Sequence, residues 1–209
     1  MSEQAQEISN PFHEFQAGFN VIIDLITPGA KVLDLGCGSG TLLARLGQEK
    51  DIEGCGVELD QEKVVRCNER GIRVLTLDLD RGLEGFPDLS YDYVVLSRTL
   101  QQLARPEHLV REMLRVGSKS IIAFPNFGQW KVRVYYLLTG RTPVSQTFPL
   151  PWYNSPDIHR ITVYDFRHFV NDIGGRIEKE IFILENEPRV GIFWPNIRAE
   201  WGCVQISAQ

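Results

Sequence analysis

A glycine-rich stretch that follows a short apolar run is the part of this sequence best suited to chemistry. Residues 32–40 read Val-Leu-Asp-Leu-Gly-Cys-Gly-Ser-Gly. Gly36 and Gly38 allow the backbone to turn sharply and to approach a ligand without an intervening Cβ, and Gly40 allows a helix to begin close to the strand. A strand before such glycines and a helix after them indicate a phosphate or nucleoside site rather than a simple turn.

An acidic residue beside the glycines indicates which ligand they would hold. The spacing is G-x-G-x-G, whereas dinucleotide-binding turns have G-x-G-x-x-G and hold pyrophosphate. Asp34 stands two residues before the first glycine, and its carboxylate would repel pyrophosphate. It would suit S-adenosylmethionine, which carries an ammonium and a sulfonium group. The same two features make an NAD-dependent dehydrogenase the weaker alternative.

Two further acids follow the next two apolar runs. Glu58 lies 20 residues beyond Gly38, where a carboxylate can accept both ribose hydroxyls. Asp78 follows the third run and would face the adenine amino group. Each acid alone would more simply be a solvated loop or capping residue, but three at successive strand ends favour a nucleoside site. The candidate cofactor-binding residues are Asp34, Gly36, Cys37, Gly38, Glu58, Leu59, Asp78, Leu79 and Ser97.

The elements that position these residues alternate between strand and helix patterns. Apolar runs with helical segments between them are typical of a parallel sheet covered on both faces. We expect seven strands, at residues 31–35, 54–59, 73–77, 91–96, 120–124, 176–184 and 203–207. The last two have no obvious helix between them and should pair antiparallel. The predicted fold is therefore α/β and Rossmann-like: a seven-stranded, mostly parallel sheet with an antiparallel last strand.

Two segments depart from this alternation within an expected single domain, residues 1–209. In the N-terminal extension, residues 1–28, Phe12, Phe15 and Phe19 begin a helical stripe that we expect to cover one edge of the sheet. Residues 125–161 form an insertion rich in proline and aromatic residues, with one expected helix near 129–138. An insertion of this length is more often functional than idle, and we expect it to be a lid or a docking surface.

Catalytic groups are harder to identify than binding groups. Amino-methylating enzymes commonly place an Asn/Asp-Pro-Pro-aromatic turn where this chain has Ser97-Arg98-Thr99, so the catalytic residues stay unassigned. The insertion supplies the candidates for a second substrate or a partner, namely Asn126, Trp152, Tyr153, Asn154 and His159. His159 is either a base or, more simply, a hydrogen-bonded structural histidine. Cys37, inside the turn, is better explained as a small packing residue than as a nucleophile.

Composition excludes several classes of function. The 209 residues carry a net charge of −5, which argues against non-specific nucleic-acid binding. No apolar run approaches the roughly 20 residues of a membrane span. The first residues are polar and acidic, unlike a signal peptide, and the four scattered cysteines suggest reduced thiols in a cytoplasmic protein. The scattered histidines and cysteines predict no metal site.

The motifs also resemble those of a known family. VLDLGCGSG, GVELD, LDLDRGL and YDYVVLS resemble the class I methyltransferases, which bind S-adenosylmethionine on a seven-stranded sheet. EMLRVG, FPNFGQW, LTGRTPVS and WYNSPDIH are similar to the methionine biosynthesis family MetW, over roughly residues 21–203. The resemblance implies partnership with a homoserine O-acyltransferase, often called MetX. Residues 1–18 extend beyond the usual start of that family, and Arg98 replaces a more frequent glutamine at the rim of the predicted site.

Two functional hypotheses follow. In the first, the chain binds S-adenosylmethionine or its product S-adenosylhomocysteine and modulates the acyltransferase. In the alternative, it is an S-adenosylmethionine-dependent methyltransferase that acts on a small metabolite. The family resemblance and the missing catalytic turn favour the first.

Overall fold

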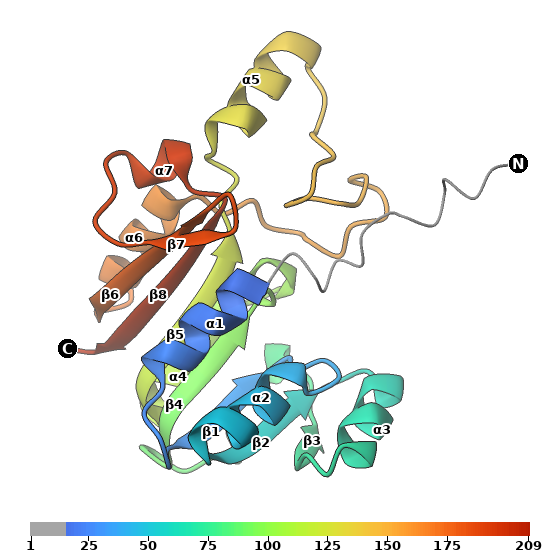
Figure 1. Ribbon diagram of the computed structural model, residues 1–209, viewed down its shortest axis with the longest axis vertical. Helices are drawn as coiled ribbons and strands as arrows, with labels where there is room; N and C mark the ends of the chain where they lie inside the picture. Colours follow the sequence, from blue (N-terminus) through green and yellow to red (C-terminus); the bar gives the residue numbers. More distant parts are fainter. Residues whose placement is uncertain (1–15) are drawn as a thin grey trace, which may run out of the picture.

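The structure is a computed structural model that describes residues 16–209. A single sheet of eight strands lies at its centre (Figure 1). The strands are β1 (Lys31–Leu35), β2 (Glu53–Glu58), β3 (Val74–Thr76), β4 (Tyr91–Ser97), β5 (Gly117–Pro125), β6 (Gly175–Leu184), β7 (Glu187–Arg189) and β8 (Trp201–Ala208). Their order is β3-β2-β1-β4-β5-β8-β6-β7. Strands β1 to β5 pair in parallel, whereas β8 runs antiparallel to both β5 and β6. The predicted α/β fold with its antiparallel last strand is confirmed.

The sheet order reverses between β1 and β4. From β1 the chain moves outward through β2 to β3, then returns to pair β4 against the other side of β1. In an open α/β sheet this reversal leaves a crevice beyond the carboxyl ends of the two central strands. The glycine-rich turn leaves β1 at that crevice.

An eighth strand corrects the predicted count of seven. β7 pairs with β6 at the outer edge of the sheet. Glu185 and Asn186, which connect the two strands, both have positive φ angles, as a tight two-residue hairpin turn requires. Asn favours that conformation but Glu does not, and Pro188 sits inside the short exposed strand, so the sequence signal for this hairpin was weak.

Helices cover both faces of the sheet. They are α1 (Gln16–Leu25), α2 (Thr41–Lys50), α3 (Gln61–Glu69), α4 (Pro106–Val116), α5 (Trp130–Thr139), α6 (Val163–Asp172) and the short α7 (Pro195–Arg198), with 3-10 turns η2 (Leu79–Arg81) and η3 (Leu100–Gln102). Because side chains alternate along a strand, Val32 packs with α1 and α2 on one face, and Leu33 packs with α4 and α6 on the other.

The N-terminal helix lies over a face of the sheet. The buried residues of α1 join a cluster that includes Val95 and Ile121 in the central strands β4 and β5. Helix α1 also contacts β6, β7 and β8, so it reaches the β7 edge of the sheet, as expected, while it lies over one of the faces. Phe12 and Phe15 lie outside the described residues.

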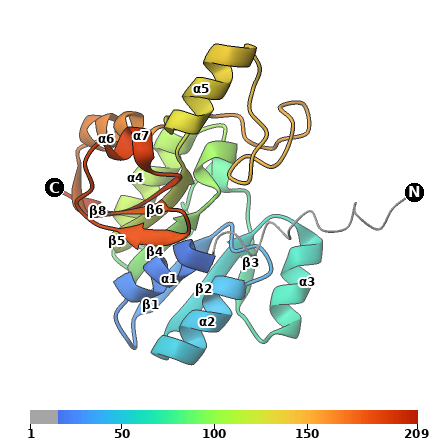
Figure 2. The same ribbon diagram turned by 45° about the horizontal axis from the view of Figure 1, so that its top comes forward.

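The insertion leaves the sheet at the end of β5 and returns at α6. Helix α5 stands away from the other elements (Figures 1 and 2), and Val132 is its buried residue. At the return point, the predicted cap of α6 is present: the Thr162 Oγ1 accepts a hydrogen bond from the Asp165 N–H. Among residues 16–209, no helix is long and apolar enough to cross a membrane.

Candidate ligand-binding site

A pocket of about 600 Å³ lies at the carboxyl ends of β1, β2 and β4, and we call it the glycine-turn pocket. Parallel pairing aligns these strand ends, so residues distant in sequence meet there. The pocket brings together every predicted cofactor-binding residue: Asp34, Gly36, Cys37, Gly38, Glu58, Leu59, Asp78, Leu79 and Ser97.

Glycines shape the turn that forms one wall of this pocket, and Gly36 and Gly38 line the wall directly. Gly36, Gly38 and Gly40 all have positive φ angles, which side chains with a Cβ rarely adopt. A Cβ on Gly36 would lie 2.5 Å from the Thr99 Oγ1, so that position also lacks space. A Cβ on Gly38 would meet nothing within 4 Å. The backbone at Gly38 therefore faces open space, where a ligand can approach it directly.

Glu58 ties this turn to the end of β2. Its Oε2 accepts a hydrogen bond from the Gly38 N–H at 2.8 Å. Its Oε1 accepts from the Leu59 and Asp60 N–H groups, both at 3.0 Å. A carboxylate offers about four acceptor positions, so one stays available for a ligand hydroxyl. Glu58 thus orders the turn as well as facing the pocket, a structural role that spacing alone did not indicate.

The carboxyl group of Asp34 lies in an environment that disfavours its ionised form. It is 3% exposed, and no hydrogen bond from residues 16–209 reaches its side chain. Burial, and then the negative charge of Glu58, raise the pKa of Asp34 to about 8. A cationic ligand group beside it would favour the ionised form and lower that pKa.

Cys37 packs inside the turn and is a poor nucleophile. Burial is the largest of the causes that raise the pKa of its thiol, followed by the nearby charge of Asp34. Its Sγ lies 4.0 Å from the Sγ of Cys67, which itself donates to the Gly38 carbonyl. Because the thiolate is the reactive form, this environment agrees with a packing role.

Asp78 and its neighbours contribute to the side of the pocket beyond β3. The Asp78 Oδ1 accepts a hydrogen bond from the Asp80 N–H at 3.1 Å and so caps η2. Leu79 is buried, and Leu59 is exposed at the pocket. The Ser97 hydroxyl is buried and has no hydrogen-bond partner among residues 16–209.

The predicted second-substrate residues do not enter this pocket. Asn126 is fully buried: its Nδ2 donates to the carbonyls of Asn196 and Ala199, and its Oδ1 accepts from the Gly128 and Val163 N–H groups. The substrate role was wrong for Asn126, because its polar atoms already hold the insertion to the sheet.

The other insertion candidates lie elsewhere on the surface. Trp152 and Tyr153 are exposed and stack edge-on, with ring centroids 5.7 Å apart, and Asn154 is also exposed. His159 lines a separate hollow of about 250 Å³ together with Phe166 and Phe169. Residues 125–161 therefore contribute nothing to the lining of the glycine-turn pocket, and their role as a lid or a docking surface stays a prediction.

The rim of the pocket comes from segments that sequence reasoning did not assign to it. Phe19 from α1 lines it, as do Thr99 and Gln102 from the loop after β4. Arg98, noted for its charge, also lines it and has a positive φ. Phe19 belonged to a visible helical stripe, but nothing local in the sequence indicated that this helix reaches the strand ends.

The described lining of the pocket contains several carboxylates and Lys63, and no histidine. Within residues 16–209, no group of three histidine, cysteine, aspartate or glutamate side chains is placed to hold a metal ion. The pocket offers a buried carboxyl group at Asp34, a carboxylate acceptor at Glu58 and an exposed glycine backbone at Gly38.

Comparisons with solved structures place this architecture in the class I methyltransferase fold. An S-adenosylmethionine-dependent methyltransferase from Archaeoglobus fulgidus has a TM-score of 0.67 and 16% identity, with 91% of each chain covered. The [4+2]-cyclase SpnF has a TM-score of 0.65 and 16% identity, over 91% of this chain and 80% of that one. The fold is thus shared by proteins with different reactions.

Sequence comparisons define the family. Residues 16–206 match the family described as methionine biosynthesis protein MetW, and the chain belongs to it. A bifunctional methionine biosynthesis protein MetXA/MetW from Rhodopirellula baltica is 38% identical over 170 residues. The match covers 77% of this chain and 27% of that relative, so this chain spans about a quarter of the relative's length.

Proposed function

We propose that this protein binds S-adenosylmethionine, or its product S-adenosylhomocysteine, in the glycine-turn pocket and modulates a homoserine O-acyltransferase. The bifunctional relative carries this proposal, because its name places MetXA and MetW in one chain. Joining two proteins raises their effective concentration for one another, which is an advantage when they act together.

The pocket supports S-adenosylmethionine by the chemistry of its groups. Asp34 would receive the positively charged methionine end, since a buried carboxylate is stabilised by an opposite charge. The remaining acceptor position of Glu58 would bind a ribose hydroxyl. Asp78 would accept from the adenine amino group at the far side of the pocket.

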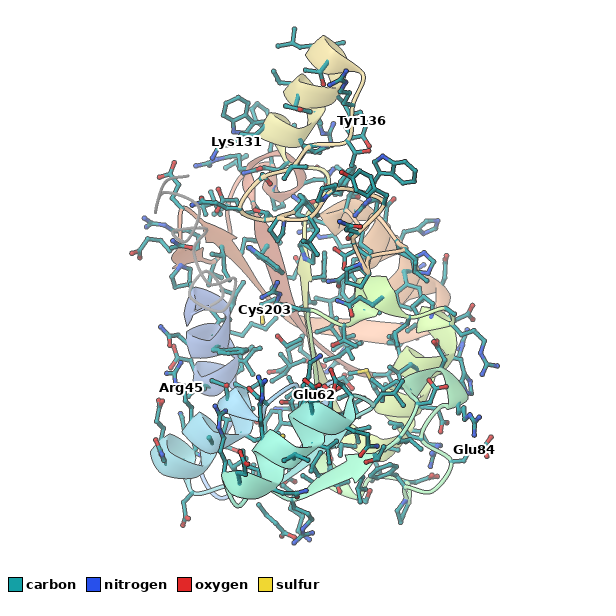
Figure 3. The ribbon with its side chains drawn as sticks, turned by 90° about the vertical axis from the view of Figure 1, so that its right-hand side faces the viewer. Arg45, Glu62, Glu84, Lys131, Tyr136 and Cys203 are labelled. Carbon is teal, nitrogen blue, oxygen red and sulfur yellow. The ribbon has the colours of Figure 1, made fainter. Side chains whose placement is uncertain are left out.

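Helix α5 supports the association with a partner. Trp130, Val134, Leu137 and Leu138 follow the i, i+4, i+7, i+8 spacing of one helical face, and all are exposed. Leu137 is 84% exposed. Figure 3 shows α5 extending beyond the body of the protein, with Lys131 and Tyr136 on opposite sides of the helix. Exposed apolar faces of this kind mark protein interaction sites, and the acyltransferase is the occupant that the bifunctional relative favours.

An S-adenosylmethionine-dependent methyltransferase is the second candidate, favoured by the similarity to the Archaeoglobus fulgidus enzyme. Ser97-Arg98-Thr99, which stands where amino-methylating enzymes have their catalytic turn, favours the regulatory function instead. SpnF illustrates that this fold does not oblige a protein to transfer methyl groups.

The two candidates are separated by mixing the purified chain with a homoserine O-acyltransferase. We expect co-elution in size exclusion and a rate of acyl transfer that changes on adding the chain, with S-adenosylmethionine and S-adenosylhomocysteine compared. Separate elution and an unchanged rate at micromolar concentrations would reject the partnership. Methyl transfer to a small acceptor would then restore the enzyme hypothesis.

A further inference from the structure

A second, smaller hollow adjoins the glycine-turn pocket and shares Arg98 and Gln102 with it. It has a volume of about 70 Å³ and lies between the loop after β4, the end of β5 and the returning part of the insertion. Pro125 and Phe127 contribute from the β5 side, and Phe148 contributes from the insertion.

The walls of this hollow are held in place by specific contacts. Phe127 packs edge-on against Phe148, with ring centroids 5.0 Å apart, and its N–H donates to the Ile161 carbonyl at 2.8 Å. The N–H groups of Ile158 and His159 both donate to the Gln101 carbonyl. The loop is therefore fixed at both sides of the hollow, and fixed walls reduce the ordering cost of binding a ligand.

Opposite charges line the hollow without neutralising one another. The guanidinium of Arg160 lies over the ring of Phe127, 5.2 Å from its centroid. Asp157 lines the same hollow, and neither residue forms an ion pair within residues 16–209. Arg98, which lies over the ring of Trp201, adds a second positive charge at the shared wall.

We infer that this hollow binds a small zwitterionic amino acid, with Arg160 receiving its carboxylate and Asp157 its ammonium group. Arg is the side chain best suited to bind a carboxylate through two hydrogen bonds. The hollow has a volume of about 70 Å³, which favours a small ligand, and serine is a small amino acid that carries both charges. The inference stands independently of the proposed function, because it uses a different set of charges.

The experiment uses three molecules of nearly equal shape. L-Serine carries both charges, L-serinamide lacks the carboxylate, and glycerate replaces the ammonium group with a hydroxyl. Binding to the purified full-length chain is measured by saturation-transfer nuclear magnetic resonance and calorimetry at millimolar concentrations. We expect L-serine to bind about tenfold more tightly than either analogue, since each charge-assisted contact contributes about that factor.

Two variants assign the charges, and a third serves as the control. Arg160→Gln should abolish the preference for L-serine over L-serinamide, and Asp157→Asn should abolish the preference over glycerate. Arg189→Gln, an exposed change in β7 outside the hollow, should leave both preferences intact. Melting temperatures and circular dichroism spectra verify that each variant is folded. No binding of L-serine, equal binding of the three molecules, or preferences that survive in both variants would overturn the inference.

Discussion

In the glycine-turn pocket two carboxyl groups, Asp34 and Glu58, are buried, whereas in the insertion several large apolar groups are exposed. Asp34 is 3% exposed, and Trp152 is 69% exposed. Each arrangement is unfavourable for the isolated chain, because a buried charge loses hydration and an exposed apolar surface orders water. Each becomes favourable when something binds. The comparison agrees with the two partners proposed above, a cationic small molecule at the strand ends and a protein at α5.

The largest expected effect is the loss of ligand affinity when Asp34 in the glycine-turn pocket is replaced. Asp34→Asn removes the negative charge that a cationic ligand requires, and removal of one partner of a buried pair costs about 3 kcal/mol or more. Affinity for S-adenosylmethionine should fall by more than about a hundredfold, measured by calorimetry. An unchanged affinity would exclude Asp34 as the cation site.

The same variant should stabilise the protein without ligand. The folded state raises the pKa of Asp34 to about 8, well above the unfolded value, so the folded state binds this proton more tightly. Its contribution to stability is complete below about pH 4 and is lost as pH rises through 8. At pH 8, Asp34→Asn should gain at least about 1 kcal/mol, or about 2–4 °C in melting temperature. A melting temperature that falls in the variant would contradict this pKa.

Substitution of Asn126 tests whether this residue stabilises the fold of the insertion. Asn126→Ala leaves its four buried backbone partners unsatisfied and should cost about 2–3 kcal/mol of unfolding free energy. Asn154→Ala, an exposed change in the same segment, is the matched control and should cost little. Chemical denaturation measures both, and equal stabilities would show that the hydrogen bonds of Asn126 contribute nothing.

Substitutions in α5 test whether its exposed apolar side chains bind a partner protein. Replacing exposed Leu137 and Leu138 by Ala should weaken binding to a homoserine O-acyltransferase by about 2 kcal/mol, or about thirtyfold, if they lie centrally in the interface. Stability should change by less than about 0.5 kcal/mol because these side chains are exposed. Loss of stability with unchanged partner affinity would assign them to the fold instead.

The smallest expected effect comes from Glu58, which bonds the glycine-rich turn and faces the pocket. Glu58→Gln keeps the size of the side chain but loses the charge and weakens its hold on the Gly38 N–H. Affinity for S-adenosylmethionine should fall by about tenfold. Glu62→Gln, an exposed change in α3, is the control, and equal affinities in the two variants would remove Glu58 from the site.

Sequence reasoning worked best where function depends on local backbone and strand order. The glycine turn, Glu58 and Asp78 sit at the ends of consecutive strands, so parallel pairing alone brings them to one pocket. It failed where long-range packing decides. The side-chain amide of Asn126 is already bonded to backbone carbonyls 70 residues or more away. Phe19 reaches the pocket only because α1 crosses a face of the sheet.

The most direct test of the central claim is calorimetry of S-adenosylmethionine binding at pH 7, repeated in two buffers that differ in ionisation enthalpy. Because the pKa of Asp34 is raised to about 8, most of its carboxyl groups carry a proton before binding. A cationic ligand should therefore release nearly one proton from wild type. Asp34→Asn should release none and bind weakly. No binding of S-adenosylmethionine by wild type, or binding without proton release, would contradict the account.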